Sequence, residues 1–163
     1  MDEHEQILNR LIILEEALKR PLVEGPFLVV SEIIDFIKHY ADEFHHAKEE
    51  TVYFEWMRGK NPSLDQGPLH CMLNEHNQGR EYIEQASHAL EQVRQGATDK
   101  EQVVRNSLNH FIELLRNHIQ KENEVLYKMA EQLDQTAQDG DKVMLPHFMR
   151  LQDEFSVVVN RYQ

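Results

Sequence analysis

The chain has 163 residues, of which 40% are apolar and 28% are charged, a length and balance typical of one folded globular domain. Its formal net charge of -12 argues against nucleic acid and anionic membranes as partners. No apolar run is long enough to span a bilayer, and the acidic start MDEHEQ is unlike a signal peptide.

Glycine and proline are few and clustered, which predicts long helices joined by short connections. In the first segment, apolar residues such as Ile7, Leu11 and Leu14 repeat with the period of a helix. Thr98 and Glu101 have the spacing of a capping box at the start of the fourth helix. In chain order, the expected helices cover about residues 2–20, 27–58, 69–95, 99–135 and 146–161.

No stretch alternates apolar and polar residues with period two, so strands are not expected. Four long helices with short connections predict an all-α fold, an up-down four-helix bundle over residues 2–136. The last segment, about 146–161, predicts an additional C-terminal helix within the same single domain, 1–163. Its apolar stripe could cap the bundle or cover a partner subunit, which would give a homodimer.

The two halves of the chain resemble each other. HHAKEETVYFEWM begins at His45 and HIQKENEVLYKMA begins at His118, and both read His, three residues, Glu, then an aromatic and aliphatic turn. A single histidine precedes each motif: His4 lies 41 residues before His45 (45 minus 4), and His76 lies 42 before His118 (118 minus 76). This repetition predicts two similar helical hairpins that face each other about a pseudo-twofold axis.

The neighbours of each histidine predict which side of its helix it occupies. Residues four apart lie on one helical face, and His45 and Glu49 share theirs with apolar residues such as Val52. His46 and Glu50 fall among charged neighbours, so we expect them to face solvent. The same test gives six inward-facing polar residues, which are His4, His45, Glu49, His76, His118 and Glu122. It also places the apolar Val125 on the inward face beside His118.

These six residues predict a metal site. A single inward histidine is most simply a hydrogen-bonded core residue, and His45 with Glu49 could form a buried ion pair. Ionised glutamates are costly to bury unless they are paired or bind metal, and the whole set without metal would be an expensive polar network. Mixed imidazole and carboxylate ligands suit iron, manganese or zinc. Six side chains are too many for one zinc ion but fit two metal ions with both carboxylates bridging, as in other helical bundles.

The ferritin-type ligand pattern is not expected. It needs Glu-x-x-His twice, and the only candidate, Glu43 to His46, is predicted to face outward. The single cysteine, Cys71, allows no internal disulfide, which favours a reducing, cytoplasmic setting.

The ordered series EHEQIL, HHAKEETVYF, MLNEHNQGR and HIQKENEVLY spans residues 4–127 and resembles the hemerythrin-like (HHE cation-binding) domain. The resemblance implies a non-haem centre of two iron ions, joined by an oxo or hydroxo bridge and by bridging carboxylates within a four-helix bundle. It also implies a protein that binds dioxygen or a related small diatomic or peroxide ligand, or one that handles or senses iron.

The sequence departs from the oxygen-carrying members of that family. Those proteins have a second histidine four residues before the third-helix histidine, where this chain has Met72, and their last carboxylate follows its histidine by five residues rather than four. The centre expected here is more symmetric and leaves more positions open to small ligands. The 27 residues between Glu49 and His76 (76 minus 49) are more similar to the iron-centre repair and iron-sensing members. The repair proteins also carry a cysteine-bearing N-terminal domain, which we do not expect here because the sequence begins shortly before His4.

The sequence is also compatible with two other functions. The chain could be a di-iron enzyme that acts on peroxide or nitric oxide or in iron-centre repair, or a metal-free helical interaction module. No catalytic residue is assigned. Tyr53 and Tyr127 could lie near the centre or serve only the core, and Arg80 could pair with a carboxylate behind the ligands or form a surface salt bridge.

Overall fold

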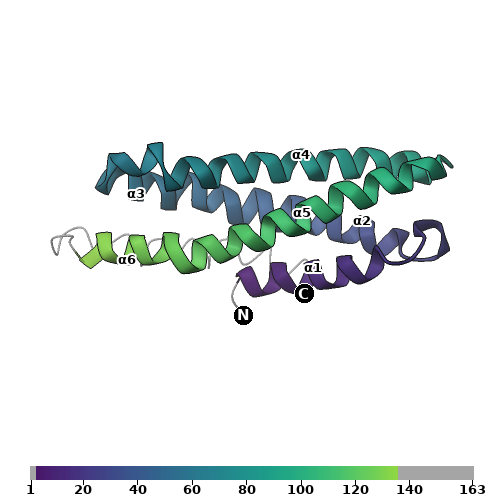
Figure 1. The fold of residues 1–163 in the computed structure, drawn as a ribbon, viewed down its shortest axis with the longest axis horizontal. Coiled ribbons are helices and arrows are strands. Elements are labelled where there is room, and N and C mark those ends of the chain that lie inside the picture. Colours follow the sequence, from purple (N-terminus) through teal and green to yellow (C-terminus); the bar gives the residue numbers. More distant parts are fainter. Residues whose placement is uncertain (1–2, 136–163) are drawn as a thin grey trace.

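The structure is a computed structural model that describes residues 3–135, and every element in this range is helical. Four long helical segments run alternately up and down, which confirms the expected all-α bundle (Figure 1). The elements are α1 (Glu3–Ala17), η1 (Leu22–Glu24), α2 (Phe27–Phe36), η2 (Ile37–His46), η3 (Glu49–Tyr53), α3 (Phe54–Lys60), η4 (Pro62–Gln66), α4 (Pro68–Arg94), η5 (Thr98–Lys100), α5 (Glu101–Lys121), η6 (Glu122–Leu126) and α6 (Tyr127–Gln135). The predicted helix over about 146–161 lies outside the described residues.

Two of the long segments are not uniform α-helices. The second runs from α2 to α3 through the π-helical turns η2 and η3, and the fourth runs from α5 to α6 through the π-helical turn η6. A π-helix has a wider turn than an α-helix because its hydrogen bonds join residues five apart instead of four. The side chains beyond each π-helical turn are therefore rotated away from the faces that an α-helical period predicts.

The connections between the long helices depend on specific backbone and side-chain contacts. Gly25 and Gly96 have positive φ values of 145° and 99°, which side chains disfavour, and each lies in the turn between two long segments. The predicted capping box at Thr98 is wrong, because residues 98–100 form the short 3-10 helix η5. The Glu101 carboxylate instead accepts a hydrogen bond from the Leu22 amide at 3.0 Å and ties the two helical connections together.

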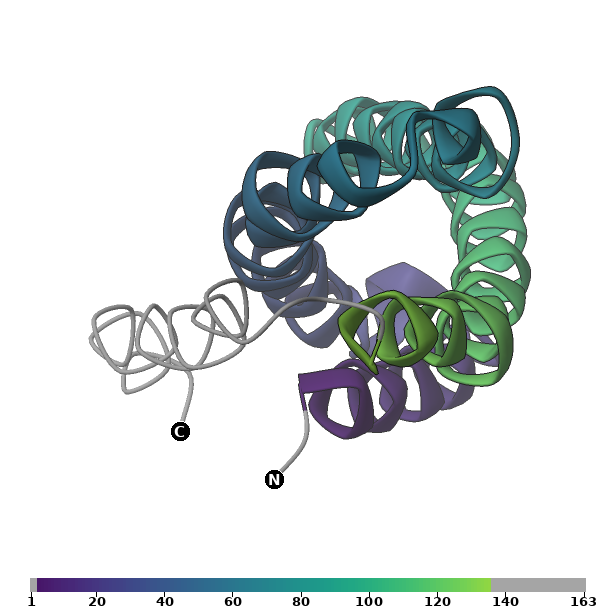
Figure 2. The ribbon, with the colours of Figure 1, turned by 90° about the vertical axis from the view of Figure 1, so that its left-hand side faces the viewer.

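The hydrophobic core is divided into two clusters along the bundle. The larger one joins α1, α2, η2, the second half of α4, and α5, with Leu11, Leu14 and Leu108 fully buried. The smaller one joins α3, η4, the start of α4, and α6, around Phe54 and Met57. The end-on view shows the helices surrounding the bundle axis (Figure 2). The inward-facing histidines and glutamates belong to neither cluster, so the sequence places a polar layer between two apolar ones.

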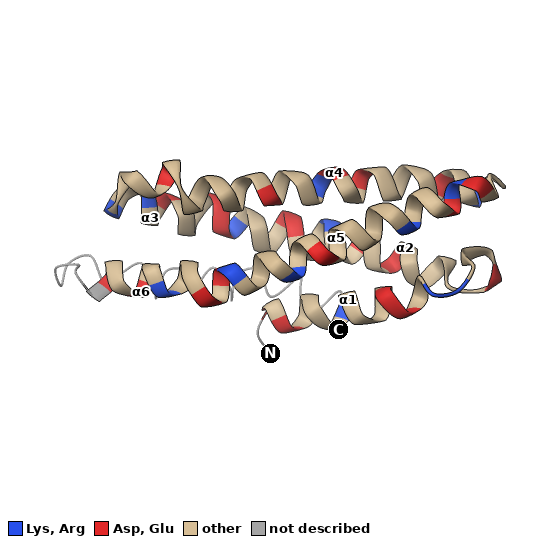
Figure 3. Ribbon diagram, in the orientation of Figure 1, with Lys and Arg blue, Asp and Glu red and all other residues tan. Residues whose placement is uncertain are grey.

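Charged residues of both signs are interspersed along the helices (Figure 3). None of the helices in the described range is both long and apolar enough to cross a membrane.

Candidate metal centre

The structure brings all six predicted site residues together in the polar layer. Each has at most 4% of its surface exposed. They come from all four long segments: His4 on α1, His45 and Glu49 on η2 and η3, His76 on α4, and His118 and Glu122 at the junction of α5 and η6.

Both glutamates are the first residue of a π-helical turn, η3 or η6. The wide turn shifts the register that follows, and it explains why Leu126 is buried whereas Val125 is 50% exposed, although an α-helical period predicted Val125 to face inward. Short π-helical segments occur frequently at functional sites.

The imidazoles meet in pairs through Nε2. The Nε2 atoms of His4 and His45 are 3.0 Å apart, and so are those of His76 and His118. Glu122 lies between the pairs, with Oε2 at 3.2 Å from His4 Nε2 and Oε1 at 3.1 Å from His118 Nε2. Glu49 Oε2 also faces both pairs, at 3.6 Å from His45 Nε2 and 3.8 Å from His76 Nε2. The six side chains thus form two four-residue donor groups that share both carboxylates.

Each of the four imidazoles also forms a hydrogen bond through Nδ1 to an oxygen atom. These pairs are His45 with Glu3 (2.7 Å), His76 with Glu50 (2.7 Å), His118 with Glu75 (3.0 Å) and His4 with Asn123 (3.0 Å). An ionised carboxylate or an amide oxygen only accepts, so Nδ1 carries the proton in each pair. Outer partners of this kind fix the tautomer and the orientation of metal-binding histidines.

This tautomer leaves the Nε2 atom of each ring without a proton. A neutral imidazole with its proton on Nδ1 has only a lone pair on Nε2. Two such lone pairs 3.0 Å apart repel each other unless a cation lies between them or one ring takes up a second proton. Two nitrogen atoms bound at right angles to one metal ion, each about 2.1 Å from it, would lie about 3 Å apart. The residues therefore fit a metal ion at each pair.

The carboxylates fit the same interpretation. Glu49 Oε2 and both carboxylate oxygens of Glu122 are buried and make no hydrogen bond to any described residue. Buried polar atoms without a partner are rare in folded proteins and are expected where an ion binds. Carboxylate and imidazole donors without thiolates suit iron, manganese or zinc.

Contacts around the donor groups repeat between the two halves of the chain. Adding 73 to the numbers of His45, Lys48 and Glu49 gives His118, Lys121 and Glu122, and adding 72 to Glu3 and His4 gives Glu75 and His76. Lys48 Nζ donates to Glu3 at 2.6 Å, and Lys121 Nζ likewise donates to Glu75. The predicted pairing of two similar hairpins is therefore visible in the side-chain contacts.

Electrostatic effects in the metal-free centre place charge unevenly. Burial, and then the charge of Glu122, raise the pKa of Glu49 well above its usual range. Burial opposes ionisation of Glu122 too, but the imidazoles of His118 and His4 that face its oxygens keep its pKa low. Although burial opposes protonation of His118, the nearby carboxylates of Glu122 and Glu75 raise its pKa to about 9. Without metal, the centre thus retains protons that a bound metal ion would displace.

Tyr127 lies at the centre rather than only in the core. Its hydroxyl donates a hydrogen bond to Glu49 Oε1 at 2.9 Å, and its ring stacks on His4 with centroids 5.8 Å apart. Tyr53 is half-buried and contacts the Tyr127 ring edge to face at 5.5 Å. Tyr127 therefore satisfies the one Glu49 oxygen that does not face the imidazole pairs.

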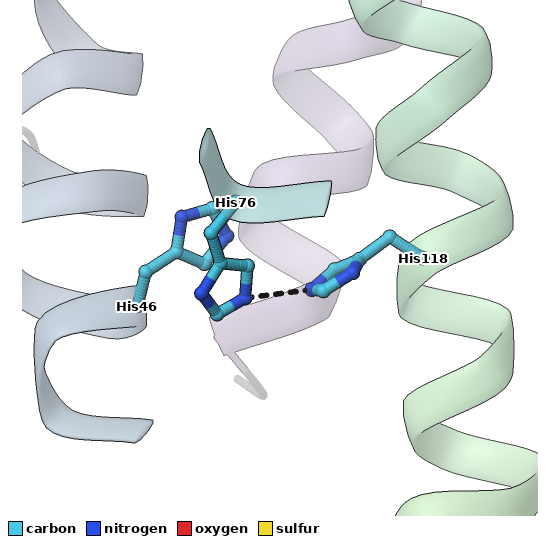
Figure 4. Close-up of side chains that lie close together, drawn as sticks. All are labelled: His46, His76 and His118. Carbon is cyan, nitrogen blue, oxygen red and sulfur yellow. Dashed lines mark hydrogen bonds between the residues drawn. The ribbon is translucent and has the colours of Figure 1, made fainter. Parts of the chain in front are cut away.

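The prediction that His46 and Glu50 face solvent is wrong. His46 is only 5% exposed. Its ring stacks on the ring of His76 (Figure 4). Glu50 is half-buried and accepts hydrogen bonds from His76 Nδ1 and from Arg80, each at 2.7 Å. The prediction assumed an α-helical period, whereas residues 37–46 are π-helical, so His45 and His46 are both buried. The same contacts place Arg80 behind the carboxylate that orients His76. The pattern of apolar residues along the sequence did not indicate that residues 37–46 would be π-helical.

Comparison with protein families matches residues 1–130 to the hemerythrin HHE cation binding domain. The chain is similar to the iron-sulfur cluster repair proteins YtfE of Escherichia coli (strain K12 / DH10B) and Shigella boydii serotype 18, with 27% identity to each over 133 residues. The similarity covers 79% of this chain but 60% of each relative, so the chain spans less than two thirds of their length. A comparison with solved structures gave no match. Since the family match covers most of the chain and includes all six inward-facing residues, the chain belongs to the hemerythrin HHE cation-binding family.

Proposed function

We propose that the chain binds two iron ions in the polar layer and uses them to bind a small diatomic ligand or peroxide. The observation that supports this most strongly is the pairing of Nε2 lone pairs at 3.0 Å, with each pair facing the same two carboxylates. Four imidazoles would hold the ions through Nε2, two to each ion, and Glu49 and Glu122 would bridge them. When bound, the iron ions supply redox-active positions for the ligand.

The protein's own residues would prepare the site for those ions. Glu3 and Glu75 hold the protons of His45 and His118 on Nδ1, which leaves each Nε2 free to bind metal. Tyr127 orients Glu49 through its hydroxyl. The six residues are almost fully buried between the two apolar clusters, so electrostatic interactions among them are weakly screened.

Metal analysis with an optical spectrum tests this proposal. We expect about two irons per chain and the absorption bands of an oxo-bridged di-iron centre. His118→Ala should lose iron and these bands, because it removes a donor from one pair. His39→Ala is a matched control, since His39 is exposed and contacts the exposed Glu43 at 2.8 Å, away from the donor groups. The proposal fails if His118→Ala retains both irons, or if removing iron leaves stability unchanged.

A second candidate function is iron handling during iron-sulfur cluster repair, which the name of the curated relatives favours. Iron-loaded protein would then transfer iron to a metal-free iron-sulfur protein faster than the same amount of free ferrous iron does. An enzyme acting on peroxide or nitric oxide would instead show turnover that disappears in His118→Ala. Tight binding with neither transfer nor turnover would leave ligand binding as the function.

A further inference from the structure

His46 is a buried polar residue that the proposed metal ligands do not explain. It is 5% exposed, and neither ring nitrogen forms a hydrogen bond to any described residue. The nearest carboxylate oxygen, Asp42 Oδ1, is 3.6 Å from Nδ1, which is beyond hydrogen-bond range. Each of the four imidazoles in the donor groups, by contrast, forms a hydrogen bond through Nδ1 and faces a second imidazole through Nε2. A buried imidazole without partners is unusual and points to a missing ligand.

The position of His46 makes it a neighbour of one proposed metal ion rather than a ligand. Nitrogen atoms of His46, His76 and His118 all lie within 4.8 Å of one another. The His46 ring stacks on the His76 ring (Figure 4). The ring centroids are 3.9 Å apart and the planes are only 13° from parallel. A metal ion bound to an imidazole nitrogen lies in the plane of that ring. Two stacked, nearly parallel rings cannot both contain the same ion in their planes, so His46 lies beside the coordination sphere.

The pseudo-twofold repeat shows that the fold does not require a histidine at this position. The residue that corresponds to His46 in the other half is Ile119 (119 minus 46 is 73), which is 2% exposed. An apolar side chain therefore serves the same place beside the other half of the site. His46 makes the two halves chemically different.

A pocket of about 260 Å³ lies against His46 and His76. Its walls include Ile37, Asp42, Gly79, Arg80, Ile83 and Phe111. It extends from the partly exposed side chains of Asp42 and Arg80 to the two buried imidazoles. Because a single water molecule needs only about 10–15 Å³ of such space, the pocket has ample room for a small ligand.

The charged side chains that line this pocket are two of each sign, Lys38 and Arg80 against Asp42 and Glu84. Arg80 donates to Asp42 at 2.8 Å and to Glu50 at 2.7 Å, and Lys38 donates to the Ser87 hydroxyl at 2.7 Å. A highly charged ligand would therefore meet little net charge. The pocket suits a small neutral molecule or a monoanion that can accept one hydrogen bond from an imidazole.

We propose that this pocket admits the small ligand to the metal ion held by His76 and His118, and that His46 positions the ligand there by hydrogen bonding. The inference rests on the proposed function. It specifies that the ligand binds in the half of the centre that contains His76 and His118, and that His46 holds it there. His46 is a positioning residue in this scheme.

Azide is a suitable probe, because it is a three-atom monoanion with acceptor nitrogens. The test compares iron-loaded wild type with His46→Ile, which copies the other half, and with His46→Gln, which retains a hydrogen-bond donor. Ile119→Val is the matched control at the equivalent position. Iron per chain, azide affinity by optical titration and binding rates by stopped flow are measured for each protein.

We expect His46→Ile to keep two irons and to bind azide at least ten-fold more weakly through faster dissociation. His46→Gln should recover part of that affinity, and Ile119→Val should match wild type. Gly79→Val should slow azide association, because even a Cβ at Gly79 would lie 3.4 Å from Phe111 and a larger side chain would enter the pocket. In metal-free protein, His46→Ile should raise the urea midpoint, since it removes a buried group without partners.

Several results would overturn the inference. Loss of iron in His46→Ile would make His46 a ligand, and unchanged azide affinity in that variant would remove its positioning role. An unchanged association rate in Gly79→Val would exclude the pocket as the route. Wild-type protein that binds no iron would overturn the proposed function and this inference together. Wild-type protein that binds iron, with an azide affinity that the His46 substitutions leave unchanged, would overturn this inference alone.

Discussion

Replacing Glu49 by glutamine should separate the stability of the metal-free protein from its ability to bind metal. Glu49 is 1% exposed, and burial together with the nearby charge of Glu122 raises its pKa well above 4.5. In the metal-free protein this carboxyl group therefore resists ionisation at neutral pH. Glutamine has nearly the same shape as the protonated acid and retains an oxygen that can accept the Tyr127 hydrogen bond.

The size of the effect follows from proton linkage. The pKa of Glu49 is higher in the folded protein than the unfolded value of 4.5, so the wild type loses stability relative to the glutamine variant as pH rises from 4.5 towards the folded pKa. Each pH unit in that window corresponds to about 1.4 kcal/mol. At pH 7.5, three units above 4.5, the upper limit is about 4 kcal/mol. Water penetration and relaxation around a buried charge reduce this limit, and we expect a gain of about 1–4 kcal/mol.

Urea unfolding of chelator-treated protein at pH 5.5 and pH 7.5 measures this gain. Glu49→Gln should be more stable than wild type, by a larger margin at pH 7.5, while its iron content falls from about two per chain to one or none. Glu113→Gln, which changes an exposed residue of α5, is the control and should alter neither quantity. The reasoning is refuted if the stability difference is the same at both pH values, if the variant is less stable at pH 7.5, or if it retains both irons.

Four further predictions concern the surroundings of the centre. Glu75→Gln should weaken metal binding about 10–100-fold, because His118 loses the carboxylate that orients it; metal competition measures this, and unchanged affinity would contradict it. Tyr127→Phe should lower the unfolding free energy of metal-free protein by about 1–3 kcal/mol, since buried Glu49 loses the hydrogen bond from the Tyr127 hydroxyl. An unchanged urea midpoint would argue against this hydrogen bond. The apparent metal affinity should increase from pH 7 to about pH 9 and then level off, because His118, with its pKa of about 9, loses the proton that competes with metal. Calorimetry in buffers of different ionisation enthalpy should detect the proton that metal binding releases. A metal affinity that does not change with pH would refute this prediction. Leu108→Ala should destabilise the protein by about 2–5 kcal/mol without reducing its metal content, because Leu108 is fully buried in the larger apolar cluster. Loss of iron from folded Leu108→Ala protein would contradict this and show that the cluster also supports the metal centre.

The apolar pattern of the sequence was sufficient to predict the inward-facing site residues. His4 lies on the stripe of Ile7 and Leu11, and His118 lies among apolar neighbours of α5, so their burial follows from the same periodicity that buries the core. His45 and Glu49, four residues apart, remain on one side of their segment through the wide turns as well. Their prediction therefore tolerated a change in helical geometry.

The faces of His46 and Val125 could not be predicted in this way. Both assignments assumed that 3.6 residues complete a turn, but η2 and η6 are π-helical. The extra width buried His46 and exposed Val125. The predicted capping box failed for a related reason, since Glu101 bonds to the Leu22 amide, 79 residues away in the chain.

The sequence by itself determined the helical fold, its scarce breaks and the six polar residues directed into it, because these depend on local periodicity and on residue type. The tertiary structure alone decided how those residues are supported. It paired His76 with Glu50 and Arg80, set Tyr127 against Glu49, and placed His46 on the face of His76 beside a pocket. Such contacts join segments distant in sequence and depend on local departures from the α-helix, so no periodic pattern along the chain encodes them.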